Sequence, residues 1–320
     1  LLFVVSGYEE IGLGHVYNTL LLANDIVEHE VVFLVDNKSQ LALDKINSKN
    51  YPVYMQTESD IVEDVKQLNP DVVINDRLDT TEQYIAAIKA AGIKTINFED
   101  LGTGAHIADL VINAIYPERE VLPKHYFGHE YFILRDEFIL TPVQKPSAQV
   151  RKVLITFGGV DPNNYTRHVI ESITDYCQGN DIEITVVAGF GYSHYETLAP
   201  FSEIEVIRNS TNIAELMSNA DIIFTSAGRT TYEAASLNVP TIVLAQNERE
   251  MTHFFATAEH GFVNLGLGTD VSNEQILEAF VSLAENYHSR QYASNLMAKA
   301  DLVSGRQRVM KLINNIVEQV

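Results

Sequence analysis

The chain has little cysteine and no long apolar run. A single cysteine, Cys177, among 320 residues excludes an intrachain disulfide and a cysteine-rich metal site, and it fits a reducing cytoplasm. No apolar run approaches the ~20 residues that a helix needs to cross a bilayer, and no secretory signal peptide stands at the start. We therefore expect a cytoplasmic protein without a membrane span.

Positive charge is also scarce. The chain carries 22 Lys and Arg against 43 Asp and Glu, a net charge of −21. Because affinity for nucleic acid comes largely from Lys and Arg on phosphates, this balance argues against a nucleic-acid partner. A small anionic ligand needs only a few local donors, so such a ligand stays compatible with the charge.

Apolar runs alternate with amphipathic stretches along the whole chain, and 46% of the residues are hydrophobic, enough for two cores. Strands are expected at 1–5, 31–35, 52–55, 72–75, 94–98, 110–112, 153–157, 182–188, 206–207, 222–225 and 241–245. Helices are expected at 16–27, 40–49, 59–68, 81–91, 165–176, 211–220, 230–237 and 307–320. This order predicts parallel sheets with helices on both faces.

A change of composition at 140–150, with Pro142 and Pro146, predicts a linker at 142–150. The expected fold is therefore α/β, with two Rossmann-like doubly wound domains, 1–141 and 151–320, facing across a cleft. The last helix has a clean apolar stripe, and we expect it to pack back toward the first domain.

The first motif is Gly12-Leu13-Gly14-His15, which follows the first strand. Its glycines allow a tight turn, and His15 lies where the next helix begins, at the rim where open α/β sheets bind ligands. A titratable ring there suggests proton chemistry. A dinucleotide fingerprint is an alternative, since Asp36 follows about 20 residues later, but Tyr17 occupies the third glycine position. A plain tight turn is the other alternative.

Gly158-Gly159 repeats this pattern after the strand at 153–157, with Asp161 and Asn164 positioned to cap a helix. The turn is either a well-made helix start or a place where backbone N–H groups meet a phosphate.

The most specific motif is Ser226-Ala227-Gly228-Arg229-Thr230, which follows the strand at 222–225 and opens a helix. Small residues and free N–H groups are typical of an anion site. The negative charge of Glu233 would repel a phosphate, so this carboxylate is better suited to accept hydrogen bonds from sugar hydroxyls. Asn247 lies on the loop after the strand at 241–245. The alternative is an ordinary capped helix with a structural glutamate.

Polar residues also end the strands of the first half, namely Asn75-Asp76, Glu99-Asp100 and Asn113. Taken singly, each is more typical of a turn or cap, but their common placement at strand ends favours a function for some. A metal site from Asp100, His106 and Asp109 is unspecific, and we predict no metal.

These motifs, in this order, resemble a known family. The resemblance rests on Ile11 to His15, Val73 to Asp76, Asn97 to Asp100, Ile133 to Phe138, Gly158 to Asp161, Ser226 to Ala234, and Asn247. The chain looks like a GT-B-type, MurG-like protein. More narrowly, it is similar to the UDP-sugar hydrolases of pseudaminic acid biosynthesis and their spore-coat-polysaccharide relatives.

The resemblance implies a role for each motif residue. His15 would be the general base on a water that attacks the anomeric carbon, and Asp76 would be a second catalytic residue. The sugar would be bound by Gly14, Asp100 and Asn247. The UDP would be bound by Gly158, Gly159, Ile207, Ser226, Ala227, Gly228, Arg229, Thr230 and Glu233. No metal and no cofactor are implied.

The chain also departs from the family pattern. Tyr17-Asn18 stand where the hydrolases carry a basic residue near the histidine, and Arg77-Leu78 follow Asp76 in place of His-Tyr. These positions lie on the sugar side, so the identity of the sugar is left open.

Three functions follow from these observations. The first is a nucleotide-sugar hydrolase in nonulosonate or surface-glycan synthesis. The second is a glycosyltransferase on the same scaffold, because fold does not fix chemistry. The third is a non-catalytic nucleotide-sugar-binding domain of a larger enzyme. The chain begins at Leu1 without an initiator methionine, so we expect a piece of a longer polypeptide, with a fused sugar-activating domain as one partner.

Overall fold

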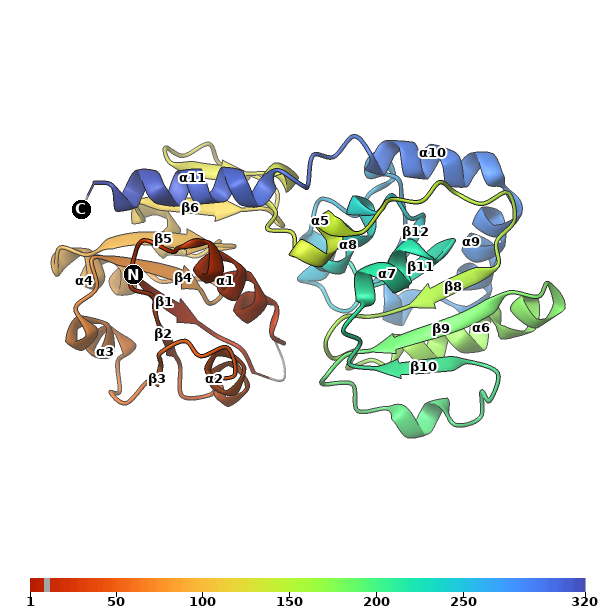
Figure 1. The fold of residues 1–320 in the computed structure, drawn as a ribbon, viewed down its shortest axis with the longest axis horizontal. Helices are drawn as coiled ribbons and strands as arrows, with labels where there is room; N and C mark the ends of the chain where they lie inside the picture. Colours follow the sequence, from red (N-terminus) through yellow and green to blue (C-terminus); the bar gives the residue numbers. More distant parts are fainter. Residues whose placement is uncertain (9–11, 320) are drawn as a thin grey trace. The chain divides into compact units, whose positions relative to one another are not determined.

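The structure, a computed structural model, describes residues 1–8 and 12–319. The chain forms two compact units (Figure 1), Leu1–Ile133 with Ser304–Val320, and Leu134–Val303. Each unit is built on one parallel sheet, as the sequence predicted, and each is described by itself below.

Seven parallel strands form the sheet in the described part of the first unit, in the order β3-β2-β1-β4-β5-β6-β7. Their bounds are β1 Leu2–Val5, β2 Val32–Val35, β3 Val53–Met55, β4 Val72–Asp76, β5 Lys94–Phe98, β6 Leu110–Asn113 and β7 His125–Phe127. The central strands are continuous apolar runs because both faces of the sheet are covered.

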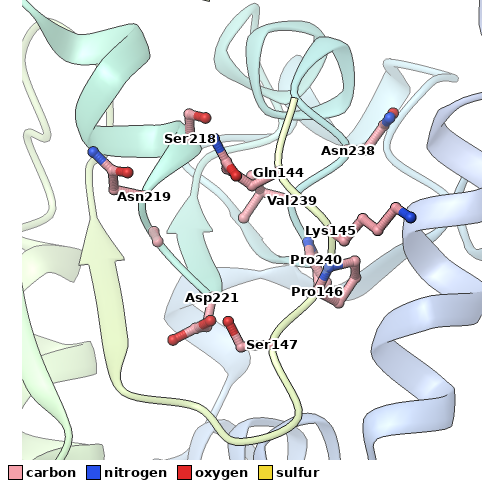
Figure 2. Close-up of a pocket in the computed structure, with 11 residues that line it drawn as sticks. Gln144, Lys145, Pro146, Ser147, Ser218, Asn219, Asp221, Asn238, Val239 and Pro240 are labelled. Carbon is pink, nitrogen blue, oxygen red and sulfur yellow. The ribbon is translucent and has the colours of Figure 1, made fainter. Parts of the chain in front are cut away.

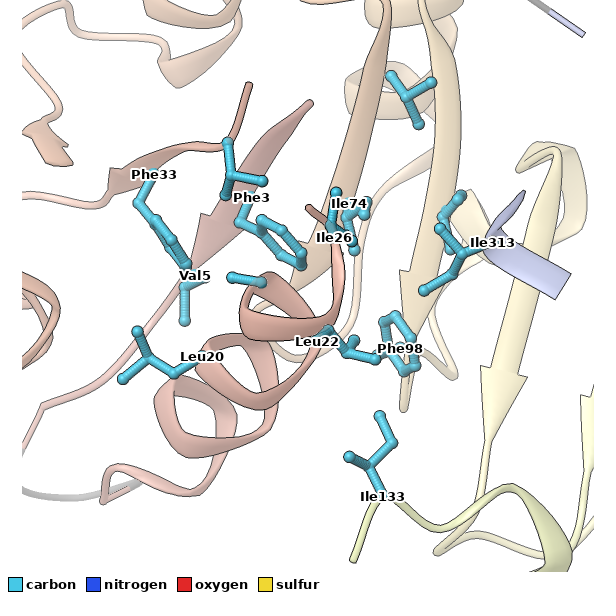
Figure 3. Packing of buried hydrophobic residues seen from close by; sticks show 14 of the residues in the cluster. Phe3, Val5, Leu20, Leu22, Ile26, Phe33, Ile74, Phe98, Ile133 and Ile313 are labelled. Carbon is cyan, nitrogen blue, oxygen red and sulfur yellow. The ribbon is translucent and has the colours of Figure 1, made fainter. Parts of the chain in front are cut away.

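Helices cover both faces of this sheet. They are α1 Gly14–Asp25, α2 Gln40–Asn47, α3 Ile61–Leu68, α4 Glu82–Ala90 and α11 Gly305–Val317. Alternate residues of β1 point to opposite faces. Phe3 and Val5 join the core that includes α1, α2 and α11, and Figure 3 shows Phe3, Leu22 and Ile313 in this cluster. Leu2 and Val4 pack with residues of α3 and α4.

Six parallel strands form the sheet among the described residues of the second unit, in the order β10-β9-β8-β11-β12-β13. They are β8 Lys152–Ile155, β9 Glu183–Ala188, β10 Glu205–Arg208, β11 Ile222–Thr225, β12 Thr241–Ala245 and β13 Phe262–Leu267. The helices are α5 Asp136–Leu140, α6 Tyr165–Gly179, α7 Ile213–Ser218, α8 Thr230–Ser236, α9 Asn273–Glu285 and α10 Tyr287–Met297. The main core of the unit lies between this sheet and helices α6 and α9.

The segment predicted as a linker is fixed to the second unit by hydrogen bonds. The Ser218 hydroxyl donates to the Pro142 carbonyl oxygen at 2.7 Å. The buried Arg290 guanidinium donates to the carbonyl oxygens of Ser147 and Ala148 at 2.8 and 3.1 Å. The chain thus changes units at Ile133 and again at Val303, outside the segment 142–150.

Strand order reverses once in each sheet. In the first unit the reversal falls between β1 and β4, and in the second between β8 and β11. Such a switch point leaves a crevice at the carboxyl ends of the two strands, which is where doubly wound sheets bind ligands. Within the described residues, no helix is long and apolar enough to cross a membrane.

Candidate functional site

His15 and Asp76 meet at the switch point of the first unit. Gly12 has a φ of +71°, which lets the chain turn into α1, so that His15 is the second residue of the helix. Asp76 ends β4 and pairs in register with Val5 of β1. The two side chains follow from neighbouring strands, and His15 Nδ1 lies 2.5 Å from Asp76 Oδ1.

The carboxylate of Asp76 sets the orientation of the His15 ring. Asp76 is fully buried, and the His15 side chain is 14% exposed. Asn18, one turn along α1, donates from Nδ2 to the other oxygen, Asp76 Oδ2, at 2.7 Å. With Asp76 as acceptor, Nδ1 of His15 carries the proton, and Nε2 has the lone pair that accepts a proton from a reactant.

Asp100 lies in a buried network beside this pair. Its oxygens accept hydrogen bonds from Thr80 N, Thr80 Oγ1, Asn97 Nδ2 and Gly102 N, at 2.6 to 2.9 Å. Asn97 in turn accepts from Asn75 Nδ2 at 2.8 Å. These bonds join the segments that follow β4 and β5. The sugar-binding roles given to Asp100 and to Gly14, the first residue of α1, stay predictions.

Asp36 is the acidic residue on which the alternative of a dinucleotide-binding site depended, and neighbouring residues hold its carboxylate by hydrogen bonds. Its oxygens accept from the Ser6 hydroxyl at 2.6 Å, from Lys38 N at 3.0 Å and from the Ser39 hydroxyl at 2.9 Å. These three bonds fix the turn after β2 and favour a structural part for Asp36 over contact with a ribose.

The Gly158-Gly159 turn lies at the switch point of the second unit. Gly158 has a φ of +77°, a conformation that favours glycine. A Cβ on Gly189, which follows β9, would lie 2.3 Å from the Gly158 carbonyl oxygen, whereas a Cβ on Gly159 would meet no heavy atom within 4 Å. The turn is therefore packed on one side and open on the other. Asp161 accepts from Tyr165 N and Thr166 N, both at 2.9 Å, and so caps α6.

The turn 226–230 lies on the other side of the same switch point, after β11. Ala227 N donates to Glu250 Oε2 at 3.2 Å, and the Ala227 carbonyl oxygen accepts from His253 Nδ1 at 2.7 Å. Within the part of the chain that the structure describes, the N–H groups of Gly228 and Thr230 donate no hydrogen bond. These two groups are donors available to a ligand.

Glu233, one turn into α8, is paired with an arginine. Arg135 donates to Glu233 Oε1 from Nε at 2.9 Å and from Nη2 at 2.8 Å. Burial raises the pKa of the Glu233 carboxyl, against the opposing effect of Arg135. Arg135 Nη1 also reaches Glu137 Oε1 at 2.6 Å. Among the residues that the structure describes, no group donates a hydrogen bond to its second oxygen, Oε2.

The remaining predicted site residues lie near the same end of this sheet. Ile207 is a half-buried residue of β10, which lies at the edge of the sheet formed by the described residues. Asn247 is exposed on the loop after β12, and its Oδ1 accepts from Glu250 N at 3.0 Å.

In the second unit, sequence reasoning missed three residues that hold the site: Arg135, Glu250 and His253. Arg135 lies in a stretch that carried the family resemblance, so its motif was visible but its partner Glu233, 98 residues away, was not. Glu250 and His253 follow Asn247 without any recognisable pattern, and only the fold brings them to Ala227.

A cavity of about 220 Å³ lies elsewhere on the second unit. Figure 2 shows its lining, which includes Lys145, Asp221 and Pro240. Asp221 and Pro240 immediately precede β11 and β12, so this cavity lies at the amino ends of the strands, away from the turns described above. Among the described residues, no three or more His, Cys, Asp or Glu side chains gather in a group that could hold a metal ion.

Two proteins show how this chain is related in sequence. An uncharacterized protein of Methanocaldococcus jannaschii is 30% identical over 324 residues, 88% of this chain, and this chain spans 66% of that protein's length. The spore coat polysaccharide biosynthesis protein SpsG of Bacillus subtilis is 25% identical over 338 residues, covering 99% of this chain and 98% of SpsG. No family model matches the chain.

Solved structures show the same fold at lower identity. MurG of Acinetobacter baumannii superposes with a TM-score of 0.69 at 16% identity, over 98% of this chain and 99% of MurG. Anabaena HepE, solved in complex with UDP, gives 0.65 at 13% identity over the full length of both chains. These likenesses establish the two-domain GT-B fold, and SpsG matches from end to end. The chain therefore has the GT-B fold of MurG and HepE, and its sequence is similar to that of SpsG over its full length.

Proposed function

We propose that the protein is an enzyme that acts on a nucleotide sugar, of the UDP class, and hydrolyses it to the free sugar and UDP. The relative SpsG is named for polysaccharide biosynthesis, and HepE of the same fold was solved with UDP. We propose a place in surface-glycan biosynthesis from the name of SpsG, and a place in nonulosonate biosynthesis from the motif resemblance alone.

The observation that carries the hydrolase proposal is the 2.5 Å contact between His15 Nδ1 and Asp76 Oδ1. His15 Nε2 takes a proton from a water as the water oxygen attacks the anomeric carbon. The bond from that carbon to the diphosphate breaks on the opposite side, which inverts the anomeric configuration. The buried carboxylate of Asp76 stabilises the imidazolium that forms.

The second unit supplies the proposed nucleotide site. The donors that support it are the N–H groups of Gly228 and Thr230 and the open side of the Gly158-Gly159 turn. Backbone donors stabilise the charge that grows on UDP as it leaves. Glu233 Oε2 would accept from a ribose hydroxyl while Arg135 holds Oε1, and the backbone of Ile207 would meet the base.

A glycosyltransferase is the second candidate, and the names of the fold neighbours favour it. MurG is a neighbour, and others are described as the glycosyltransferases of kitacinnamycin and calicheamicin. The same histidine would then take a proton from an acceptor hydroxyl instead of from water. The two candidate enzymes use the same base, His15. They differ in the nucleophile, which is water in the hydrolase and an acceptor hydroxyl in the glycosyltransferase.

The test is release of nucleotide from a panel of UDP-, GDP- and CMP-sugars. We expect release by the wild-type chain from at least one UDP-sugar without an added acceptor, and a fall of about 10²-fold or more in His15→Ala. His29→Ala is the matched control, because His29 is exposed on a loop of the same unit.

Each other outcome has a distinct meaning. Release only after an acceptor is added supports the glycosyltransferase and overturns the hydrolase. Full activity of His15→Ala overturns the assignment of the base. Nucleotide binding without release under any condition overturns both enzymes and favours a binding module.

A further inference from the structure

Both backbone polar groups of Ala227 are held by side chains from one short segment. Glu250 accepts the hydrogen bond of Ala227 N at 3.2 Å, and His253 donates to the Ala227 carbonyl oxygen at 2.7 Å. The two side chains come from the turn 250–253 that follows β12, and we call them the Ala227 brace. Ala227 itself is 2% exposed.

Glu250 links two loops through a single oxygen. Its Oε2 accepts from Ala227 N and from Gln246 N, the latter at 2.8 Å, and the Ser226 side chain also hydrogen-bonds to this carboxyl. Removing a carboxylate from water is costly unless such donors replace the water. Three donors from the ends of β11 and β12 do so here, and the carboxylate in turn fixes those donors.

His253 completes the brace as a neutral ring. Burial lowers the pKa of His253 to about 4, so the ring carries no charge at neutral pH. Its Nδ1 bears the proton that the Ala227 carbonyl accepts. The positive charges of Arg229 and Arg249 also lower this pKa, so a neutral donor avoids adding a further cation near them.

The brace leaves a defined set of groups in the turn 226–230 for a ligand. Since Ala227 N is used by Glu250, the N–H groups of Gly228 and Thr230 are the ones that donate to no other described residue. A Cβ on Gly228 would lie 3.2 Å from Glu250 Oε1, so the close approach of the carboxylate favours glycine here. The turn is thus held in one orientation before any ligand arrives.

We propose that Glu250 and His253 are positioning residues that pre-organise the turn 226–230 for the diphosphate of a nucleotide sugar. This inference rests on the proposed function, because it assigns the diphosphate to that turn. Without the brace, the ordering of the turn has to occur on binding, which weakens affinity. The brace itself does not touch the diphosphate.

The experiment is calorimetric titration of UDP into the whole chain and its variants. We expect Glu250→Ala and His253→Ala each to raise the Kd for UDP about tenfold, which is about 1.4 kcal/mol. Glu250→Gln and His253→Asn should stay within about threefold of wild type, because each keeps the acceptor or donor that Ala227 needs. Glu248→Ala, which removes an exposed carboxylate from the same loop, is the matched control.

Rescue by the conservative variants separates positioning from general stability. Thermal melting of each variant shows whether it is folded at the titration temperature. The double variant Glu250→Ala/His253→Ala should raise the Kd for UDP by less than the product of the two single-variant factors, because both side chains hold the same residue, Ala227.

The outcomes also separate this inference from the proposed function. If Glu250→Ala and His253→Ala are folded and bind UDP with wild-type affinity, the positioning role of the brace is overturned, and the proposed function is not affected. UDP binding that depends on the brace, without release of any sugar, supports the brace and overturns the hydrolase. A wild-type chain that binds no nucleoside diphosphate overturns both.

Discussion

A histidine acts as a base when one ring nitrogen is held protonated and the other is left with its lone pair. Asp76 imposes this state on His15, and Asn18 fixes Asp76 from its other side. The sequence predicted His15 at a helix start and Asp76 at a strand end, so both positions followed from local patterns. The role of Asn18 did not, because it depends on a contact over 58 residues.

Replacing Asp76 with Asn should lower the turnover number for nucleotide release by about 10²-fold or more. An amide in this place can donate to Nδ1, which favours the tautomer with the proton on Nε2, and that tautomer is a poor base. Asp36 is another acidic residue at the end of a strand, and the turnover number of Asp36→Asn should stay within a few-fold of the wild-type value. Equal turnover of Asp76→Asn and wild type would show that the pair is structural.

Because His253 titrates, the free energy of unfolding should decrease as the pH is lowered. Because its pKa in the folded protein is about 4, below its usual value of about 6.5, the unfolded chain binds the proton first. Stability is thus fully present above pH 6.5 and is lost as pH falls toward 4. Between pH 7 and pH 5 this group alone should remove about 2 kcal/mol.

His253→Asn keeps the donor to Ala227 but does not titrate. Urea unfolding of both proteins at pH 7 and pH 5 isolates the histidine, because the burial-raised pKa of Glu250, which acts with the opposite sign, is common to both. The loss of stability in acid should be about 2 kcal/mol smaller in His253→Asn. An equal loss in the two proteins would contradict the assignment.

At the scale of elements, the two candidate sites are built in the same way. Each has a glycine turn after one strand and polar groups after its neighbour across the reversal of strand order. In the second unit, the loop after β9 supports the Gly158-Gly159 turn, because Gly189 packs against Gly158 and Gly159 without room for a side chain.

Gly189→Ala should therefore lower the free energy of unfolding by about 1–3 kcal/mol, as overpacking does. It should also weaken UDP binding, since the Cβ displaces the turn. Gly179→Ala is the matched control, because a Cβ at the end of α6 meets no heavy atom within 4 Å. If urea unfolding finds Gly189→Ala as stable as Gly179→Ala, the packing of this loop is not what holds the turn.

The elements that sequence reasoning found and missed differ in physical terms. Continuous apolar runs such as β4 and β11 were predicted because strands buried on both faces leave that pattern. Strand β13 was missed since Asn264 and Gly266 interrupt its run, and β7 is only three residues long. Helix α9 was overlooked although its capping box, Ser272 with Gln275, is a sequence signal.

At the scale of the whole chain, the last helix belongs to the first unit. Val309, Ile313 and Ile316 of α11 lie in the same core as Phe3. Arg306 pairs with Asp25, and Arg308 donates to the Glu130 carbonyl oxygen at 3.0 Å. The apolar stripe of α11 was plain in the sequence, but the surface it covers is set by contacts over nearly the full length of the chain.

Ile313→Ala should destabilise the first unit by about 2–5 kcal/mol, because the buried side chain leaves a cavity. Hydrogen exchange followed by mass spectrometry should show faster exchange in peptides of 1–133 and 304–319, with peptides of 134–303 unchanged. Lys311→Ala, which is exposed on the same helix, should leave both units unchanged. Faster exchange confined to 134–303 would contradict the assignment of α11.

The proposed role of His15 is to direct a water to an anomeric carbon. The most direct measurement is nucleotide-sugar turnover in ¹⁸O-labelled water, with mass spectrometry of both products. We predict that one ¹⁸O enters the released sugar at its anomeric carbon, that none enters UDP, and that His15→Ala slows this labelling by about 10²-fold or more. Label in the UDP instead, or labelling of the sugar at an unchanged rate in His15→Ala, would contradict it.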